Sequence, residues 1–381
     1  MTAPVTPRVA AFDRLRGLIM VLMAIDHASF FIARVHAAET WAAAPPYYAD
    51  LPAFLTRWLT HLCAPGFFML MGIGIVWFGE SRRAAGWSPA QIAKFFVTRG
   101  GTLLLVQHFL ENPAWLLGVV SADPALGEAM NRLPGVPGDV MLGFAVLSAL
   151  GFAMIVWGIC WRSPVWAIVV ICGGALGLSR VMIPDASAAT QAIVVWKLLF
   201  FVPGQGGIVQ NLYPWVIWLV PAGVGVALGR VFLRRPERIP AAAGVGAVVG
   251  VCAFVVMRVT GQGEYHELTR GLIGWLTVTK YPPSEAFLAL MLGLDLGLLA
   301  AMSKWPRRWM AIFEVYGRVP FFFYLAHLYA FGVLSWAFRS GTSRPVMYLV
   351  WAVVVAALYP ACAAYARVKF AKPATSLWRM F

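Results

Sequence analysis

Apolar stretches of about 20 residues recur along the whole chain, and each is long enough to cross the roughly 30 Å of hydrocarbon in a bilayer. The stretches are continuous in their hydrophobicity rather than alternating, which favours helices over strands. Only helices or closed barrels satisfy their backbone hydrogen bonds in lipid. We therefore predict ten transmembrane helices, over 15–35, 55–78, 92–114, 139–160, 164–183, 213–233, 240–260, 284–303, 310–338 and 345–367.

The composition agrees with a membrane protein. Of the 381 residues, 61% are hydrophobic and 12% are charged, whereas soluble domains are about 45–50% apolar and about 25% charged. We find no internal repeat, low-complexity tract or long linker that would divide the chain. The prediction is one all-α integral membrane domain over 1–381, a polytopic helix bundle.

The basic residues indicate the orientation. With residues near helix ends assigned to the adjoining connection, 20 of the 30 Lys and Arg lie in the two termini and the even-numbered connections, together with only four of the 16 acids. By the positive-inside rule, both termini are predicted to be cytoplasmic. The net charge of +14 is thus explained by topology. The Lys and Arg residues form short clusters at helix ends, such as Arg234-Arg235. Because such clusters anchor helix ends, nucleic acid is not expected as a partner.

An acid and an imidazole, Asp26 and His27, interrupt the first apolar run. Ionisable groups inside a span are energetically unfavourable and usually functional. Neighbours on a helix point about 100° apart, so Asp26 is expected to pair with an Arg or His on another helix rather than with His27. His27 can move a proton near neutral pH.

Four histidines, His27, His61, His108 and His327, fall at similar depth in the outer half of four predicted helices. We predict that they share a polar cavity. For His108 and His327 the alternative is a hydrogen bond that joins two helices. The histidines show no metal-ligand spacing, and no metal is expected.

Several segments resemble a known family: "FDRLRGLIMVLMAIDHASFF", "LPAFLTRWLTHLCAPGFFMLMGIG", "NLYPWVIWLVPAGVGVALG", "KYPPS" and "YGRVPFFFYLAHLY". In this order they are similar to the bacterial branch of the heparan-α-glucosaminide N-acetyltransferase family, over about 11–367. The resemblance implies a transmembrane acyltransferase that moves an acetyl group from cytoplasmic acetyl-CoA to an amine or hydroxyl of an extracytoplasmic sugar or glycan. It also implies a bacterial inner (cytoplasmic) membrane.

The resemblance leaves three candidates for the catalytic histidine. The bacterial pattern has Asp-His on the first helix and Thr-His on the second, which match Asp26-His27 and Thr60-His61 here. In the lysosomal enzymes the catalytic histidine lies in the following loop, where this chain offers His36. The assignment stays open among His27, His61 and His36.

Acyl transfer needs a base, a donor for the developing oxyanion and cations for the phosphates of CoA. The oxyanion donor could be Arg57, Asn112 or Tyr324. Arginine's forked donors suit phosphate. We expect the phosphate ligands among the predicted cytoplasmic arginines, which are Arg16, Arg82, Arg83, Arg99 and Arg318.

A second class of function stays open. Intramembrane acids and histidines also build proton relays, so a proton-coupled transporter or flippase is the alternative. Against it, the chain has no evident inverted repeat or paired broken helices. A homodimer is compatible with either function.

Overall fold

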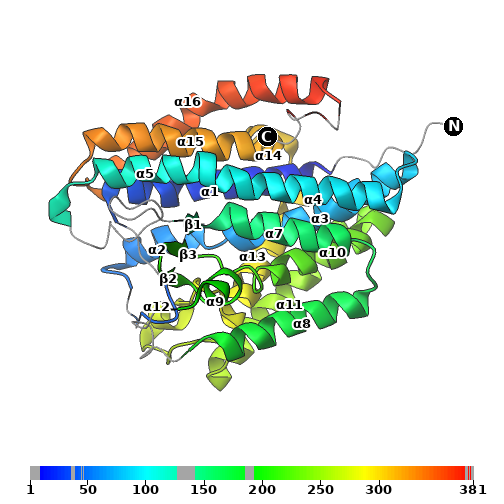
Figure 1. Ribbon diagram of the computed structural model, residues 1–381, viewed down its shortest axis with the longest axis horizontal. Helices are drawn as coiled ribbons and strands as arrows, with labels where there is room; N and C mark the ends of the chain where they lie inside the picture. Colours follow the sequence, from blue (N-terminus) through cyan, green and yellow to red (C-terminus); the bar gives the residue numbers. More distant parts are fainter. Residues whose placement is uncertain are drawn as a thin grey trace.

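Helices that run along one common axis make up most of the computed structural model (Figure 1). The residues that the structure describes are 9–35, 39–43, 45, 47–126, 142–184, 193–373, 376 and 378. The longer helices are α1 (Ala10–Ala28), α2 (Leu51–Thr60), α3 (Cys63–Ala84), α4 (Pro89–Val106), α5 (Asn112–Ser121), α7 (Val146–Ile159), α8 (Val165–Met182), α10 (Leu219–Arg234), α11 (Ile239–Thr260), α13 (Glu285–Lys304), α14 (Arg307–Arg318), α15 (Pro320–Leu334) and α16 (Arg344–Ala371). Two short helices, α9 (Val195–Phe200) and α12 (Gly271–Leu276), lie in connections.

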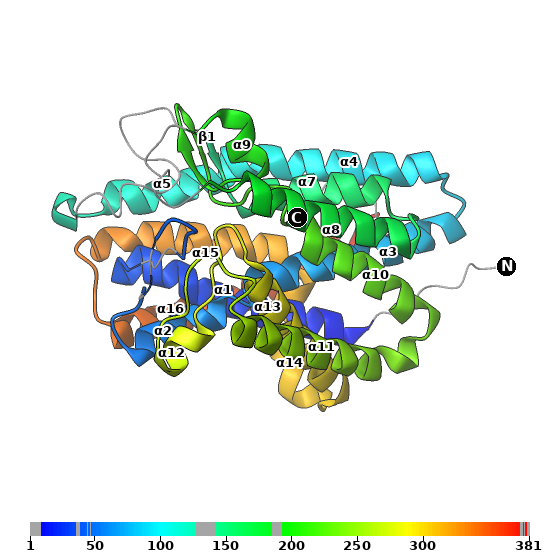
Figure 2. The same cartoon turned by 90° about the horizontal axis from the view of Figure 1, so that it is seen from below.

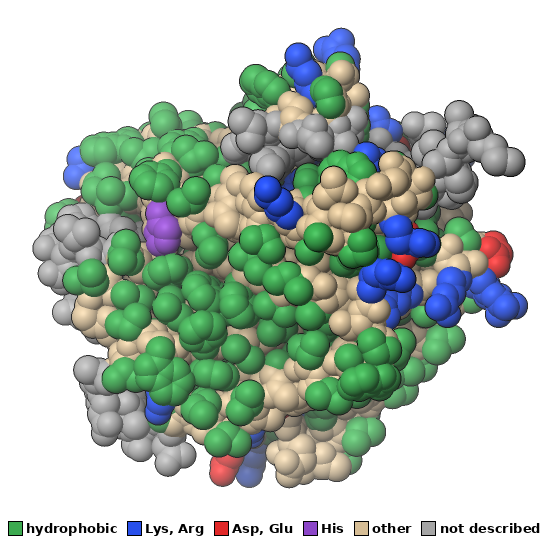
Figure 3. Space-filling view, turned by 45° about the vertical axis from the view of Figure 1, so that its right-hand side comes forward, with side chains coloured by type: hydrophobic (Ala, Val, Ile, Leu, Met, Phe, Trp, Pro, Cys, Tyr) green, Lys and Arg blue, Asp and Glu red, His purple; other side chains and the backbone are tan. Residues whose placement is uncertain are grey.

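Within the described part of the chain, eight helical stretches are long and apolar enough to cross a membrane. Apolar side chains remain exposed on the outside of the bundle, for example Val169 on α8 and Val259 on α11. Figure 3 shows a broad hydrophobic surface with Lys and Arg gathered toward one margin. An all-α membrane bundle explains this surface, because lipid rather than water covers it.

Four predicted helices match the structure closely. The predictions over 164–183, 240–260, 284–303 and 345–367 correspond to α8, α11, α13 and α16, with differences of a few residues at their ends. A proline near the start or a polar connection bounds each of these helices. Such signals for helix ends lie within a few residues of the end in the sequence, so they can be recognised without the tertiary structure. The prediction is confirmed for these elements.

The predicted second helix, 55–78, is divided into α2 and α3 at His61 and Leu62. Pro65 has no N–H to donate to the His61 carbonyl, which interrupts the helical ladder at this point. The third predicted helix, 92–114, extends to Ser121 through a π-helical turn at Gln107–Glu111. The first one, 15–35, begins at Ala10 and also ends in a π-helical turn, Ser29–Ala33.

The predictions over 139–160 and 213–233 are wrong at their starts, because a strand occupies 142–144 ahead of α7 and a hydrogen-bonded turn occupies 215–218 ahead of α10. Strands β1 (Leu142–Phe144), β2 (Gly204–Gly206) and β3 (Val209–Asn211) pair in the order β1-β3-β2, with β1 parallel and β2 antiparallel to β3. Asn211 holds the sheet against α9 by donating its side-chain amide to the carbonyl of Leu198. A short apolar run does not by itself distinguish a strand from a helix.

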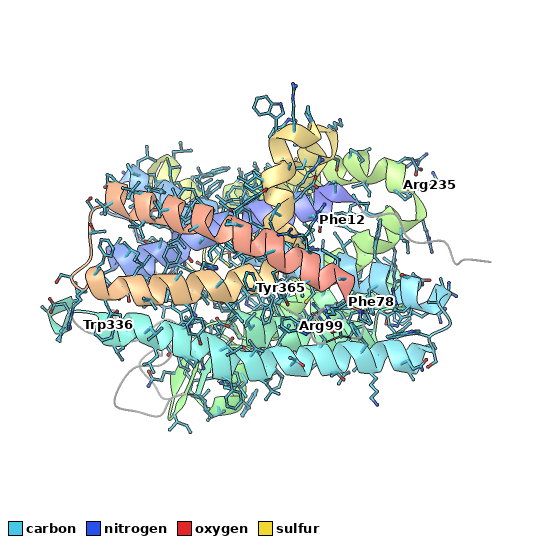
Figure 4. All side chains as sticks on the ribbon, turned by 90° about the horizontal axis from the view of Figure 1, so that it is seen from above. Phe12, Phe78, Arg99, Arg235, Trp336 and Tyr365 are labelled. Atoms are coloured by element: carbon cyan, nitrogen blue, oxygen red, sulfur yellow. The ribbon has the colours of Figure 1, made fainter. Side chains whose placement is uncertain are left out.

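The prediction of one helix over 310–338 is also wrong. Val319, with φ −132° and ψ 50°, separates α14 from α15 because a residue before proline avoids the helical region. α14 runs across the bundle rather than along it (Figure 4). It packs tightly on α1: a Cβ at Gly17 would lie 1.8 Å from the Phe313 carbonyl oxygen, and a Cβ at Gly317 1.8 Å from that of Asp13.

The connections divide between the two ends of the bundle. The start of α1, the α3–α4 connection and the α10–α11 connection lie at one end, on the right in Figure 1. The α15–α16 connection, α2, α12 and the sheet lie toward the other end, as Figure 2 also shows. Each end therefore gathers segments that are far apart in the sequence.

Candidate functional site

His27 lies near the end of α1 and contacts a second histidine on α15. Its Nδ1 is 2.7 Å from Nε2 of His327, and both side chains are buried. The ring of His27 also meets the edges of Trp115 and Tyr324. Two of the four predicted histidines are thus brought together.

His27 lines a small chamber of about 50 Å³. Two carboxyl groups, Asp26 and Glu111, line the same space, together with Trp115, Ala145, Val146, Leu212, Tyr213, Tyr281 and Tyr324. Glu111 Oε1 accepts hydrogen bonds from Tyr324 Oη at 2.6 Å and from Trp115 Nε1 at 3.3 Å. Its other oxygen, Oε2, is buried without a hydrogen-bond partner among the described residues. The chamber therefore offers an acceptor oxygen to a ligand.

Asp26 forms an ion pair with Arg57 of α2, which confirms that its partner is a basic residue of another helix. The same guanidinium is bound to Glu39 of the α1–α2 connection, with Nη2 2.8 Å from Oε2. Burial alone would raise the pKa of Glu39, but Arg57 and His61 hold that pKa well below its usual range. Because Arg57 is held by two carboxylates, it is not placed to serve as an oxyanion donor.

A larger cavity of about 340 Å³ lies between α1, α3, α4, α7 and α15. Most of its walls are apolar, with Met20, Phe67 and Phe96 among them. Four bases also line it, namely Arg16, Arg99, Arg318 and Lys369. Figure 4 shows Arg99 and the lining residue Phe78 in the half of the bundle that contains Arg235, away from Trp336.

Arg318 is only partly engaged at this cavity. Its Nη2 is 3.4 Å from Glu314 Oε2, while its Nε is buried without a hydrogen-bond partner among the described residues. Arg16 donates from Nη1 to Asp13 Oδ1 at 3.3 Å and to the Gly317 carbonyl at 3.2 Å. A buried donor without a partner is unfavourable, and an anion in the cavity would satisfy it.

The two cavities adjoin at Tyr324 and Val146, which line both of them. On α1, Arg16 lines the large cavity and His27 lines the chamber. Eleven residues of helix separate these two residues, a rise of about 16 Å. The basic cavity and the chamber that contains the imidazole thus share part of their walls.

The prediction of one cavity shared by four histidines is wrong for His61, His108 and His327, because His27 alone of the four lines the chamber, although His327 contacts His27. His61 is fully buried under Glu39, with Nε2 3.5 Å from Glu39 Oε1, and does not line the chamber. His108 packs on Phe144 and lies 3.4 Å from the Asn112 amide. Asn112 itself donates to the Gly143 carbonyl and so holds β1. Each helix turns its histidine toward a different neighbour, which spacing along one helix does not predict.

Two of the five predicted phosphate ligands, Arg82 and Arg83, lie outside the large cavity. Arg83 forms an exposed ion pair with Glu80, and Arg82 lies over the rings of Phe78 and Trp87. Neither lines the large cavity. The remaining histidine candidate, His36, lies outside the described residues.

Four residues of this region were not predicted from the sequence as site residues. They are Glu39, Glu111, Tyr213 and Tyr281, of which all but Glu39 line the chamber. Glu111 follows His108 by three residues on an apolar helix, and a carboxyl inside a span was a signal that could have singled it out. The others belong to loops, whose position depends on tertiary contacts.

No protein-family model matches the chain, and no curated protein matches it either. Any functional conclusion must therefore come from the site itself and from the resemblance in sequence.

Proposed function

We propose that the protein is a membrane acyltransferase that moves an acetyl group from acetyl-CoA to an amine or hydroxyl of a sugar or glycan. One observation carries the proposal: a basic cavity and a chamber that contains His27 adjoin at Tyr324 and Val146. The resemblance in sequence to the heparan-α-glucosaminide N-acetyltransferase family supports the same chemistry.

The proposed topology has ten crossings and cytoplasmic termini. Besides the eight long stretches, the shorter apolar helix α7, with 14 residues, and α10, with 16 residues, would complete the set. The end of the bundle that holds the start of α1 and the α10–α11 connection carries the basic residues Arg234 and Arg235. By the positive-inside rule this end would face the cytoplasm. The ligand of the basic cavity would then enter from the cytoplasm.

The basic side chains and apolar walls of the large cavity support acetyl-CoA as its ligand. Arg16, Arg99, Arg318 and Lys369 would bind the phosphates, because charge-assisted hydrogen bonds to phosphate are strong. The apolar walls would hold the pantetheine arm, and the rise of about 16 Å between Arg16 and His27 is comparable to the length of that arm when extended. The thioester would then reach the junction at Tyr324.

The chemistry at the junction follows from the side chains. His27 accepts the proton of the acceptor amine or hydroxyl as the new N–C or O–C bond forms. Tyr324 Oη would stabilise the oxygen of the thioester carbonyl, while the C–S bond breaks, by turning its hydroxyl hydrogen from Glu111 Oε1 to that oxygen. The thiolate that leaves takes up a proton, so the overall reaction yields free CoA and the acetylated acceptor.

The acceptor would approach from the end that holds the sheet and the α1–α2 connection. The chamber is large enough for the reacting groups but not for a whole sugar ring. Trp115, Tyr213 and Tyr281 provide the aromatic surfaces on which a sugar could pack.

Purified protein in lipid nanodiscs tests the proposal. We expect acetyl-CoA to bind, and free thiol to be released when glucosamine or glucose is added. If acetyl-CoA neither binds nor releases thiol with either sugar, acyl transfer is the wrong function.

Asp295 favours a second candidate, proton-coupled transport. This carboxyl on α13 is fully buried, and neither oxygen has a hydrogen-bond partner among the described residues. Buried acids in spans often carry protons through pumps and transporters. Proton-driven accumulation of a solute in vesicles without CoA would support this candidate, and Asp295→Asn should abolish that accumulation.

A further inference from the structure

The hydrogen bonds of His327 determine which of its nitrogens carries the proton. Its Nδ1 lies 2.6 Å from the carbonyl oxygen of Phe323, one turn earlier on α15. A carbonyl oxygen can only accept a hydrogen bond, so Nδ1 of His327 must be the donor. In a neutral imidazole the other nitrogen, Nε2, then carries a lone pair.

That lone pair faces His27. The Nε2 of His327 is 2.7 Å from the Nδ1 of His27, the planes of the two rings differ by 10°, and the ring centroids are 4.9 Å apart. The centroids are farther apart than the nitrogens by about the width of one ring, which is the geometry of an in-plane hydrogen bond. Since His327 accepts this bond, His27 donates it from Nδ1.

We propose that His327 is a positioning residue that holds His27 in the tautomer with its lone pair on Nε2. His327 is fully buried and lines neither cavity, so it acts on the reaction only through His27. His27 does line the chamber, and Nδ1 is its edge toward His327. The basic nitrogen of His27 is therefore Nε2, and this nitrogen is the one that can accept the proton of the acceptor. The consequence for catalysis rests on the proposed acyl transfer, whereas the tautomer does not.

The pair also stabilises the product of proton transfer. When Nε2 of His27 takes the acceptor's proton, the imidazolium keeps its Nδ1–H bond to His327. The bond is then charge-assisted and stronger than before. The surroundings of His327, which include the rings of Phe323 and Phe331, are apolar and keep water from competing for its Nε2.

Nitrogen-15 NMR of histidine-labelled protein in nanodiscs tests the tautomer directly, with the His27 signals assigned through the His27→Gln variant. We expect Nδ1 of His27 to be protonated and Nε2 to be unprotonated in the wild type. His327→Gln, whose side-chain carbonyl can accept the same bond, should keep this tautomer, and His327→Leu should give a mixture. Protonated Nε2 in the wild type, or an unchanged tautomer in His327→Leu, would overturn the proposal.

Thiol release from acetyl-CoA with glucosamine tests the catalytic consequence in the same variants. His327→Leu should lose on the order of ten- to a hundredfold in rate, the scale found for partners that orient a histidine, and His327→Gln should recover most of it. Equal losses in both variants with the tautomer retained in His327→Gln would reduce His327 to a packing role. Absence of thiol release in the wild type would refute acyl transfer instead, while the NMR result would still decide the tautomer.

Discussion

Tyr324 Oη donates a 2.6 Å hydrogen bond to Glu111 Oε1 at the place where the large cavity and the chamber adjoin. The bond joins α15 to the π-helical turn between α4 and α5. Among the described residues, Tyr324 is the aromatic side chain that the linings of the two cavities share, and this bond holds its hydroxyl in place.

Tyr324→Phe removes this bond and leaves the buried Glu111 with Trp115 as its remaining side-chain donor. We expect a loss of about 1–3 kcal/mol in the free energy of unfolding, together with slower acetyl transfer and unchanged affinity for acetyl-CoA. Tyr329→Phe is a matched control, because its hydroxyl bonds the Leu110 carbonyl and lines neither cavity. Equal rates of transfer in the two variants would contradict a role for Tyr324 at the junction.

Arg318→Ala should weaken the binding of acetyl-CoA. Each charge-assisted hydrogen bond contributes about 1.5–3 kcal/mol, so we expect a loss of roughly ten- to a hundredfold in affinity by isothermal titration. Arg16→Ala and Arg99→Ala should act in the same direction, whereas Arg83→Ala, from the exposed pair with Glu80, should bind normally. Normal affinity in all three cavity variants would refute the phosphate assignment.

His27→Ala and His61→Ala should have different effects. His27 lines the chamber, so its loss should slow acetyl transfer by more than about a hundredfold, the scale of general base catalysis, with acetyl-CoA still bound. His61 lies under Glu39 outside the chamber, so His61→Ala should retain most of the activity and unfold at a lower temperature. The reverse pattern at matched protein levels would move the catalytic role to His61, and near-normal turnover in both would direct attention to His36.

Glu39 should make stability depend on pH. Its folded pKa lies well below the ordinary value of 4.5, mainly because Arg57 opposes the effect of burial. The stabilisation is therefore complete above pH 4.5 and is lost as pH falls through the folded pKa. Melting temperatures between pH 7 and pH 3 should fall less steeply for Glu39→Gln than for the wild type, and Glu80→Gln at the surface should match the wild type. Parallel curves for all three proteins would show that folding does not shift the pKa of Glu39.

Labelling of single cysteines tests the topology in a variant without the five native cysteines. Ala85→Cys in the α3–α4 connection should react with an impermeant thiol reagent only after the membrane is opened. Ser343→Cys, at the start of α16, should react in intact cells. Labelling of Ala85→Cys from outside would reverse the proposed orientation and, with it, the side from which the large cavity is filled.

Sequence patterns alone predicted the features that depend on local chemistry. Long apolar runs identified α8, α11, α13 and α16, since a span must satisfy its backbone internally. The interruption next to His61 also has a local cause, the proline at 65. The energetic penalty of a charge inside a span was enough to predict that Asp26 has a basic partner on another helix, although not that the partner is Arg57.

Tertiary packing decided which of these side chains meet. Depth in the membrane follows from counting residues, but the direction in which a helix turns its side chain depends on its neighbours. His27 and His61 lie at comparable predicted depths, yet α1 turns His27 toward His327 while His61 is enclosed between Glu39 and Phe287. In the same way, the break before Pro320 and the close contact of Gly17 with α14 bring Arg318 to the cavity that Arg16 lines. The spacing of residues along the sequence describes the faces of one helix at a time. A site between helices depends on how those faces pack against one another, which the tertiary structure decides.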